Sequence, residues 1–199
     1  MKRTLSKLAL LSSSILLATS TFADVTASAT AKWDATAVKD TQSSLVVTPL
    51  KSLSFQYAEG LDTFNQQNGA FDVTIQGQSG STDFELTSKV ISNTLTRTGD
   101  ASTLDVGVAW NGEKLSKTTT TTLINTANNI NAGLEALSQQ SAYAGTDRTS
   151  AQGTFAFSID SATSDGTTAA DFKELADGMW NGEVAVQFTA VWTEQAPGA

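Results

Sequence analysis

The chain has 199 residues and a formal net charge of −8, and it contains no cysteine and no histidine. This length suits one domain of moderate size, or one domain with a long arm. Without cysteine no disulfide stabilises the fold, and without histidine the usual general base and the commonest zinc ligand are missing, so a hydrolase has little support and we expect no cofactor. The acidic balance repels phosphate backbones, which argues against a nucleic-acid partner.

Residues 1–23 have the order of a secretory signal peptide. Three basic residues at positions 2, 3 and 7 precede an apolar run at 8–17, and small residues lead to a cleavage site after Ala23. The run is too short for a transmembrane helix, which needs about 20 residues. Removal of the signal leaves nine basic residues against 20 acidic ones, a net charge of −11 for a mature chain that begins at Asp24.

The segment after the cleavage site, residues 24–44, is predicted to be an extended arm and linker. Apolar and polar residues alternate strictly over 25–37, which is far longer than an ordinary strand of about five or six residues. At about 3.3 Å per residue this stretch would span roughly 40 Å. Its apolar positions are Val25, Ala27, Ala29, Ala31, Trp33, Ala35 and Ala37.

Small side chains distinguish this arm from the first strand of a complete sandwich, which is the alternative interpretation, because such a strand carries bulky residues on its buried face. Alanine suits insertion into a narrow preformed groove, where backbone hydrogen bonds supply much of the binding, and Trp33 would fix the register. The next segment favours the arm. Residues 45–55 already provide a bulky opening strand, broken at Pro49, after a polar linker at 38–44.

Period-two alternation through the body at 45–193 predicts half-buried β-strands. Asn111-Gly112 predicts a two-residue hairpin, whose second strand would begin at Glu113 and continue through the threonine run at 118–122. Short helical turns are expected within 125–140 and at 171–175, the latter closed by Gly178. The remaining strands are expected at 53–57, 71–75, 84–86, 90–95, 104–110, 155–159 and 184–192.

Many short strands with polar turns and little helix predict an all-β fold, an immunoglobulin-like antiparallel β-sandwich. With the arm outside it, the body lacks one strand and exposes an apolar groove, which the arm of the next copy can fill. Enzyme and ion motifs match poorly. Glu113 stands where a phosphate loop needs lysine, and Asp160 and Asp165 do not have the spacing of a calcium loop.

Several motifs, taken together, resemble the major fimbrillins of the enterobacterial common pilus, a family built by an alternative chaperone-usher pathway. They are ADVTA at 23–27, Trp33, LVVTPL at 45–50 and FQYAEG at 55–60, and the likeness continues to VQF at 186–188 and Trp192. The resemblance covers essentially the whole mature chain. The C-terminal tail at 194–199 runs past the end expected for such subunits.

The resemblance implies a structural pilus subunit and not an enzyme. A periplasmic chaperone would deliver it to an outer-membrane usher, and copies of the chain would polymerise by donor-strand exchange, with 25–37 as the donor strand. It also implies an extracellular fimbrium on the bacterial cell surface, contact with a tip adhesin, adherence to the host-cell surface and early biofilm formation.

The acceptor groove is expected to have the last strand, 184–192, as one wall, because chaperones of such systems pair with the last strand of a pilin. Its expected lining is Val186, Phe188, Trp192, Leu53 and Phe55.

A carbohydrate-binding tip adhesin or a soluble lectin-like module is the alternative function. Such a protein would expose aromatic residues in polar loops. The candidates are Tyr143, Trp180 and Phe64, although each is more often a core or edge residue.

Overall fold

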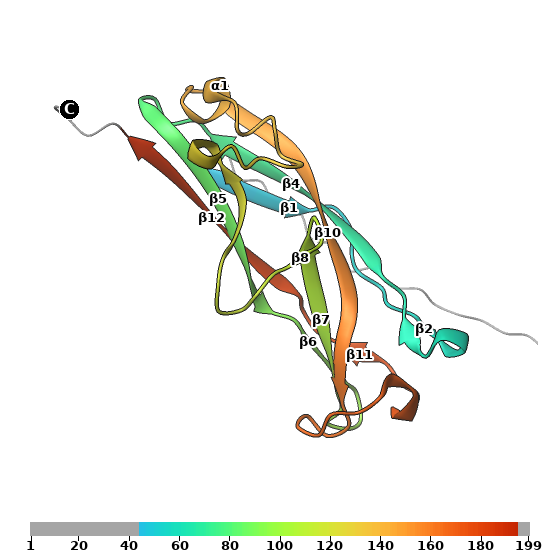
Figure 1. Ribbon diagram of the computed structural model, residues 1–199. Helices are drawn as coiled ribbons and strands as arrows, with labels where there is room; N and C mark the ends of the chain where they lie inside the picture. Colours follow the sequence, from blue (N-terminus) through green and yellow to red (C-terminus); the bar gives the residue numbers. More distant parts are fainter. Residues whose placement is uncertain (1–43, 195–199) are drawn as a thin grey trace, which may run out of the picture. The chain divides into compact units, whose positions relative to one another are not determined.

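The computed structural model describes residues 44–194, which form antiparallel β-sheets packed face to face (Figure 1). The larger sheet has the strand order β1-β4-β10-β7-β6-β11, with β8 also paired to β7. The smaller sheet has the order β12-β5-β9, and β2 pairs with β3 in a separate hairpin. The expectation of a mostly β, antiparallel fold is confirmed.

The strands of the larger sheet are β1 (Leu45–Pro49), β4 (Gln67–Gln76), β6 (Thr94–Arg97), β7 (Thr103–Trp110), β8 (Glu113–Lys114), β10 (Arg148–Thr163) and β11 (Trp180–Asn181). Those of the smaller sheet are β5 (Ser81–Ser92), β9 (Thr121–Asn125) and β12 (Ala185–Glu194). The hairpin consists of β2 (Tyr57–Ala58) and β3 (Thr63–Phe64). Short helical turns are η1 (Glu59–Leu61), η2 (Thr126–Asn128), α1 (Gln140–Tyr143) and η3 (Phe172–Glu174).

The core lies between the two sheets and follows the predicted alternation. Every second residue of β4 from Gly69 to Ile75 is buried, and the same holds for β7 from Leu104 to Trp110. From the smaller sheet, Phe84 and Leu86 enter the same cluster. Period two therefore predicted correctly which side chains of these strands face the interior.

One lateral side of the sandwich is closed by the chain itself. Asn111 and Gly112 have positive φ angles of 48° and 87°, as a two-residue turn requires, and the predicted hairpin between β7 and β8 is confirmed. The Leu115 N–H then donates to Val108 O of the larger sheet (2.8 Å), while Ser116 O accepts from Val90 N–H of the smaller sheet (3.0 Å). Two consecutive residues thus join the two sheets.

This crossing contradicts the prediction that the strand from Glu113 continues through the threonine run. The strand β8 ends at Lys114, and the chain enters the other sheet as β9, which pairs with β5. The high β-propensity of the run is real, because Thr121 and Thr122 lie in β9. Propensity alone does not indicate which sheet a strand joins.

Two further strand predictions are wrong in their limits. The segment 53–57 is not a strand except for Tyr57, which opens β2, although Leu53 and Phe55 still pack against the core. The separate strands expected at 84–86 and 90–95 are one long strand, β5, followed by β6 after Asn93. At Asn93 the chain passes from the smaller to the larger sheet, and the Asn93 side chain donates to Val106 O (2.7 Å).

The predicted helical turns are confirmed in part. Within 125–140 lies η2, whereas α1 begins only at Gln140 and ends beyond that range. At 171–175 lies η3, which ends at Glu174 with Leu175 as its C-cap, and Gly178 has no part in its end. Among residues 44–194, no helix is long and apolar enough to cross a membrane.

Candidate functional site

The strand β12 has a partner on only one edge within residues 44–194, where it pairs with β5. The N–H of Val90 in β5 donates away from β12, to Ser116, and successive residues of a strand direct their backbone groups to opposite edges. The backbone N–H and C=O of odd-numbered β5 residues therefore point at β12, and from 83 to 89 each of these residues is paired with an odd-numbered residue of β12, as in Thr87↔Thr189. The even-numbered residues of β12 from 186 to 192 direct their N–H and C=O at the unpaired edge. They are Val186, Phe188, Ala190 and Trp192.

The side chains of these same four residues are apolar and half-buried, whereas Gln187, Thr189 and Val191 between them are exposed. Phe188 packs on Phe71, with ring centroids 5.2 Å apart. Trp192 packs on Phe84 at the same centroid distance. The free edge of β12 thus combines unpaired backbone groups with an incompletely covered apolar face.

The strand β1 has the same character on the larger sheet. It pairs only with β4 in the described range, and Ser44 O accepts from Gln76 N–H (2.8 Å). Odd-numbered residues of β1 therefore direct their backbone groups at the free edge, and the side chains of Leu45 and Val47 pack half-buried against the core. Pro49 has no N–H, and its position on the free edge costs no ladder hydrogen bond.

The two free edges lie on the same side of the sandwich. Phe71 stands opposite Pro49 in the β1–β4 ladder and also touches Phe188 of β12. The other side is closed by the crossing at Leu115 and Ser116. The edges of β1 and β12 therefore flank the lateral side that no described segment bridges.

Two buried polar atoms beside this open side have no hydrogen-bond partner among residues 44–194. They are the indole N–H of Trp192 and the hydroxyl of Ser88, the residue opposite Phe188. An unsatisfied buried donor of this kind costs about 1–3 kcal/mol. Unsatisfied polar atoms of β12 and of its neighbour β5 thus accompany the incompletely covered apolar face of β12.

The structure brings some of the predicted groove residues together. Val186, Phe188 and Trp192 share one face of β12, while Leu53 and Phe55 lie in the irregular segment between β1 and β2, half-buried against the core. The predicted donor residues at 25–37, and the cleavage site at Ala23, lie outside the described residues. Their role, and that of the groove residues, stays a prediction.

Sequence reasoning missed Leu45, Val47 and Ala190 as edge residues. Ala190 continues the alternation of Val186 and Phe188, so the pattern itself could have indicated it. Which edge of β1 is free is a property of the sheet order and has no local signal except Pro49.

The aromatic residues suggested for a lectin are not exposed in polar loops. Tyr143 is buried, and its hydroxyl donates to Thr82 O (3.2 Å). Phe64 and Trp180 are half-buried and lie edge to face with ring centroids 6.5 Å apart. Within residues 44–194 no group of three acidic side chains is placed to hold a metal ion.

Comparison with known proteins gives consistent matches. A family model described as Fimbrillin MatB matches residues 26–192. The common pilus major fimbrillin subunit EcpA of Klebsiella pneumoniae subsp. pneumoniae is 55% identical over 174 residues, covering 86% of this chain and 88% of that protein. The subunit of the same name from Escherichia coli is 54% identical over 174 residues, with the same two coverages of 86% and 88%. The CooA pilin subunit from enterotoxigenic Escherichia coli is similar in structure, with a TM-score of 0.49, 17% identity, and coverage of 75% of this chain and 90% of that chain.

Proposed function

The chain belongs to the MatB family of fimbrillins, and we propose that it is the major structural subunit of a surface pilus of the common-pilus type. Members of this family are structural subunits and not enzymes. A major subunit forms a filament with copies of itself, so the question is which surface of the chain links one copy to the next.

We propose that the link is donor-strand exchange, in which residues 25–37 of one copy lie along the free edge of β12 in its neighbour. The observation that carries this proposal is the combination found at Val186, Phe188, Ala190 and Trp192. Each of these residues directs unpaired backbone groups at the free edge and an apolar, half-buried side chain at the core. An added strand satisfies the backbone groups and covers the side chains at the same time.

The dimensions of the arm and the edge agree. The strand β12 has 10 residues, which corresponds to about 33 Å at roughly 3.3 Å per residue. The alternating arm spans roughly 40 Å by the same rule. Its alanine side chains suit a shallow space between β1 and β12, and Trp33 is the one arm residue large enough to fix the register.

A free edge of this kind would aggregate if it stayed uncovered during export. We therefore propose that a periplasmic chaperone occupies the β12 edge first, and that an outer-membrane usher exchanges it for the arm of the next copy. A filament built in this way would lie on the cell surface, where we propose that it joins a tip adhesin, adheres to host cells and supports early biofilm formation.

The test compares the full-length chain with a variant that lacks residues 24–43 but keeps its signal peptide, both produced with the pilus assembly proteins of a common-pilus operon. The parent should give surface filaments and a ladder of SDS-resistant multimers that collapses on boiling. The variant should remain a monomer bound to the chaperone. A ladder of equal strength from the variant would exclude the arm as the linking strand.

A further inference from the structure

One end of the domain carries an aromatic cluster that the groove does not use. Phe64 of β3 meets Tyr57 of β2 with ring centroids 5.4 Å apart, Phe172 of η3 at 5.5 Å and Trp180 of β11 at 6.5 Å. All three contacts are edge to face, the arrangement that aromatic pairs prefer. The cluster joins the β2–β3 hairpin to the segment 171–181, so both form one end face of the domain.

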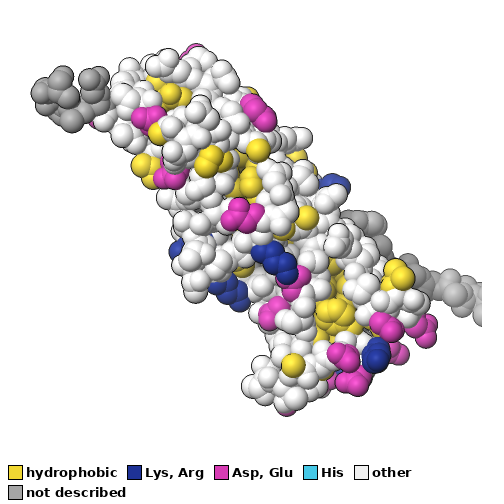
Figure 2. Space-filling view, viewed as in Figure 1, with side chains coloured by type: hydrophobic (Ala, Val, Ile, Leu, Met, Phe, Trp, Pro, Cys, Tyr) yellow, Lys and Arg dark blue, Asp and Glu magenta, His cyan; other side chains and the backbone are white. Residues whose placement is uncertain are grey.

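Two large apolar side chains on this end face are open to solvent. Leu61 in η1 is 76% exposed and Met179, next to Trp180, is 70% exposed, the two largest values among the exposed large apolar residues of the described range. Figure 2 shows hydrophobic side chains gathered at this end with acidic side chains around them. An apolar patch with a charged rim is typical of a protein-binding surface.

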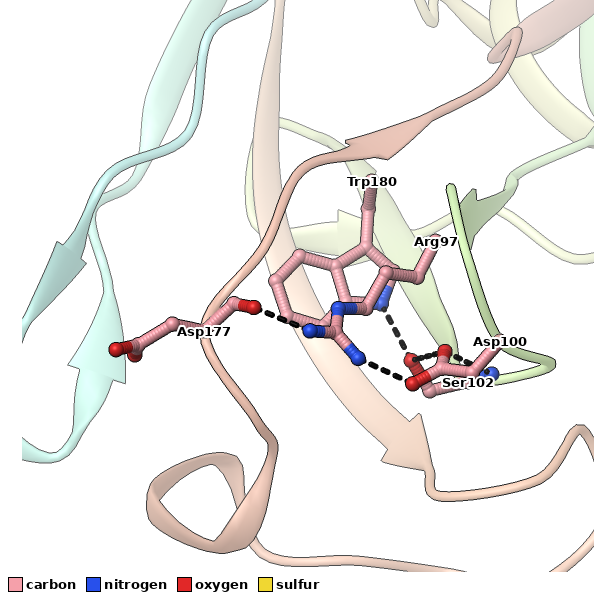
Figure 3. A network of polar contacts seen from close by, with 5 residues as sticks. All are labelled: Arg97, Asp100, Ser102, Asp177 and Trp180. Atoms are coloured by element: carbon pink, nitrogen blue, oxygen red, sulfur yellow. Dashed lines mark hydrogen bonds and ion pairs between the residues drawn. The ribbon is translucent and has the colours of Figure 1, made fainter.

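A polar network holds Trp180, the residue next to Met179, in place (Figure 3). The Arg97 guanidinium lies over the Trp180 ring, 5.6 Å from its centroid, and bonds to the Asp100 carboxylate and to Asp177 O. The Trp180 indole donates to Ser102 Oγ (3.2 Å). Hydrogen bonds from Ser102 and the Arg97 charge lower the pKa of Asp100, so it is ionised at neutral pH. The end face is thus preorganised.

The arm leaves the body at the opposite end. Ser44 pairs with Gln76, the last residue of β4, whereas the hairpin with Phe64 precedes Gln67, the first residue of β4. The 10 residues of β4 separate these two ends by about 33 Å.

We propose that the end face of Leu61, Met179 and the aromatic cluster is a docking surface for a second copy of the chain, namely for the end of its body at Ser44 from which its arm leaves. This inference rests on donor-strand exchange as proposed above. An open filament requires a heterologous, head-to-tail contact, because pairing of like ends gives closed dimers. The arm-bearing end of one copy therefore meets the opposite end of the next.

The linker limits how far apart the two bodies can be. If residues 25–37 occupy the groove, only residues 38–43 connect it to Ser44, and a fully extended linker of that length reaches about 20 Å. The two bodies are thus held close, and the exposed apolar residues of the end face are the ones available for contact.

The test uses the absence of native cysteine. A full-length chain with Leu61→Cys and Ser44→Cys is assembled into pili and treated with a short bis-maleimide. A matched control carries Ile91→Cys with Ser44→Cys, because Ile91 is also an exposed apolar residue but lies on the outer face of β5, outside the end face. The samples are boiled in SDS, so that only covalent links between copies remain.

We expect a crosslinked ladder from the Leu61 pair and a loss of that ladder in the Ile91 control. If the Leu61 pair and a second pair, Met179→Cys with Ser44→Cys, both give monomers although unboiled samples show the parental multimers, the docking inference is wrong and strand exchange stands. If the parent itself gives no SDS-resistant multimers, the proposed function fails instead. A double variant, Leu61→Glu with Met179→Glu, that keeps parental filaments but loses binding to host cells would assign the patch to a host partner and overturn the inference.

Discussion

Proline should have opposite effects at two neighbouring positions of β12, because one backbone N–H points at the free edge and the other points at β5. The N–H of Ala190 points away from β5, whereas the N–H of Val191 points into the β5–β12 ladder, opposite Glu85. Proline removes the N–H in both cases. Ala190→Pro should therefore leave the body intact and block an incoming strand, while Val191→Pro should damage the body itself.

The magnitudes follow from the hydrogen bonds that each change removes. Val191→Pro loses one ladder hydrogen bond, worth about 1 kcal/mol, and leaves a carbonyl of β5 without its donor, which costs about 1–3 kcal/mol more. For a chain of this size the melting temperature should fall by roughly 5 to 15 °C. Ala190→Pro should change it little, because the lost N–H has no partner in the described body. In the polymer it should weaken the link between subunits by about 1–3 kcal/mol.

The assay has two readings on the same material. Thermal melting of the exported monomer reports damage to the body, and the yield of SDS-resistant multimers at matched periplasmic level reports strand pairing. Ala190→Val is the matched control, because it adds a similar volume at position 190 and keeps the N–H. If Ala190→Pro polymerises as well as Ala190→Val, or melts as low as Val191→Pro, the assignment of the free edge is wrong.

Three further experiments test the arm, the network around Trp180 and the effect of acid on two carboxylates. Trp33→Asp places an unpaired charge in an apolar groove and should abolish SDS-resistant multimers, whereas Ala29→Ser on the same face should reduce them only slightly; equal yields from both would exclude the proposed register. Arg97→Met removes the bonds that hold the end face and should destabilise the body by about 1–3 kcal/mol in thermal melting. The folded-state pKa values of Asp100 and Asp165 are lowered by hydrogen bonds to neighbouring backbone and hydroxyl groups, so their contribution is present above about pH 4 and is lost as pH falls through the lowered values. A melting temperature that stays constant on acidification below pH 4 would contradict this.

The sequence predicted the interior of the strands better than their connections. The alternation at 71–75 and 104–110 identifies the buried side chains, because inward and outward positions differ in polarity at every step. The hairpin at Asn111-Gly112 is equally local, because its backbone angles need these residue types. Both features depend only on residues that are close together in the sequence.

The parts that sequence reasoning missed depend on distant partners. The crossing at Leu115 decides whether the threonine run joins β7 or β5. Packing across the core makes one strand, β5, out of segments that were predicted as two. The alternation at Leu53 and Phe55 reports burial of their side chains, but nothing local shows that the backbone there has left the ladder of β4. The end face is assembled from segments more than 100 residues apart and has no sequence signature at all.

The absence of cysteine from a chain that the sequence predicts to be exported fits the proposal that a neighbouring copy completes the body. Val186, Phe188 and Trp192 are only half-buried in the isolated body, and covering each of them fully is worth about 1 kcal/mol or more. In the proposed donor-strand exchange, burial of Trp33 would add about 2–3 kcal/mol, and each arm alanine would add less than about 1 kcal/mol. The sum is a sizeable part of the 5–15 kcal/mol that stabilises a typical domain. Under the proposed exchange, the subunit gains this stabilisation only when it receives a strand and is therefore most stable inside the filament. Assembly would then supply the stabilisation that a disulfide provides in other exported domains.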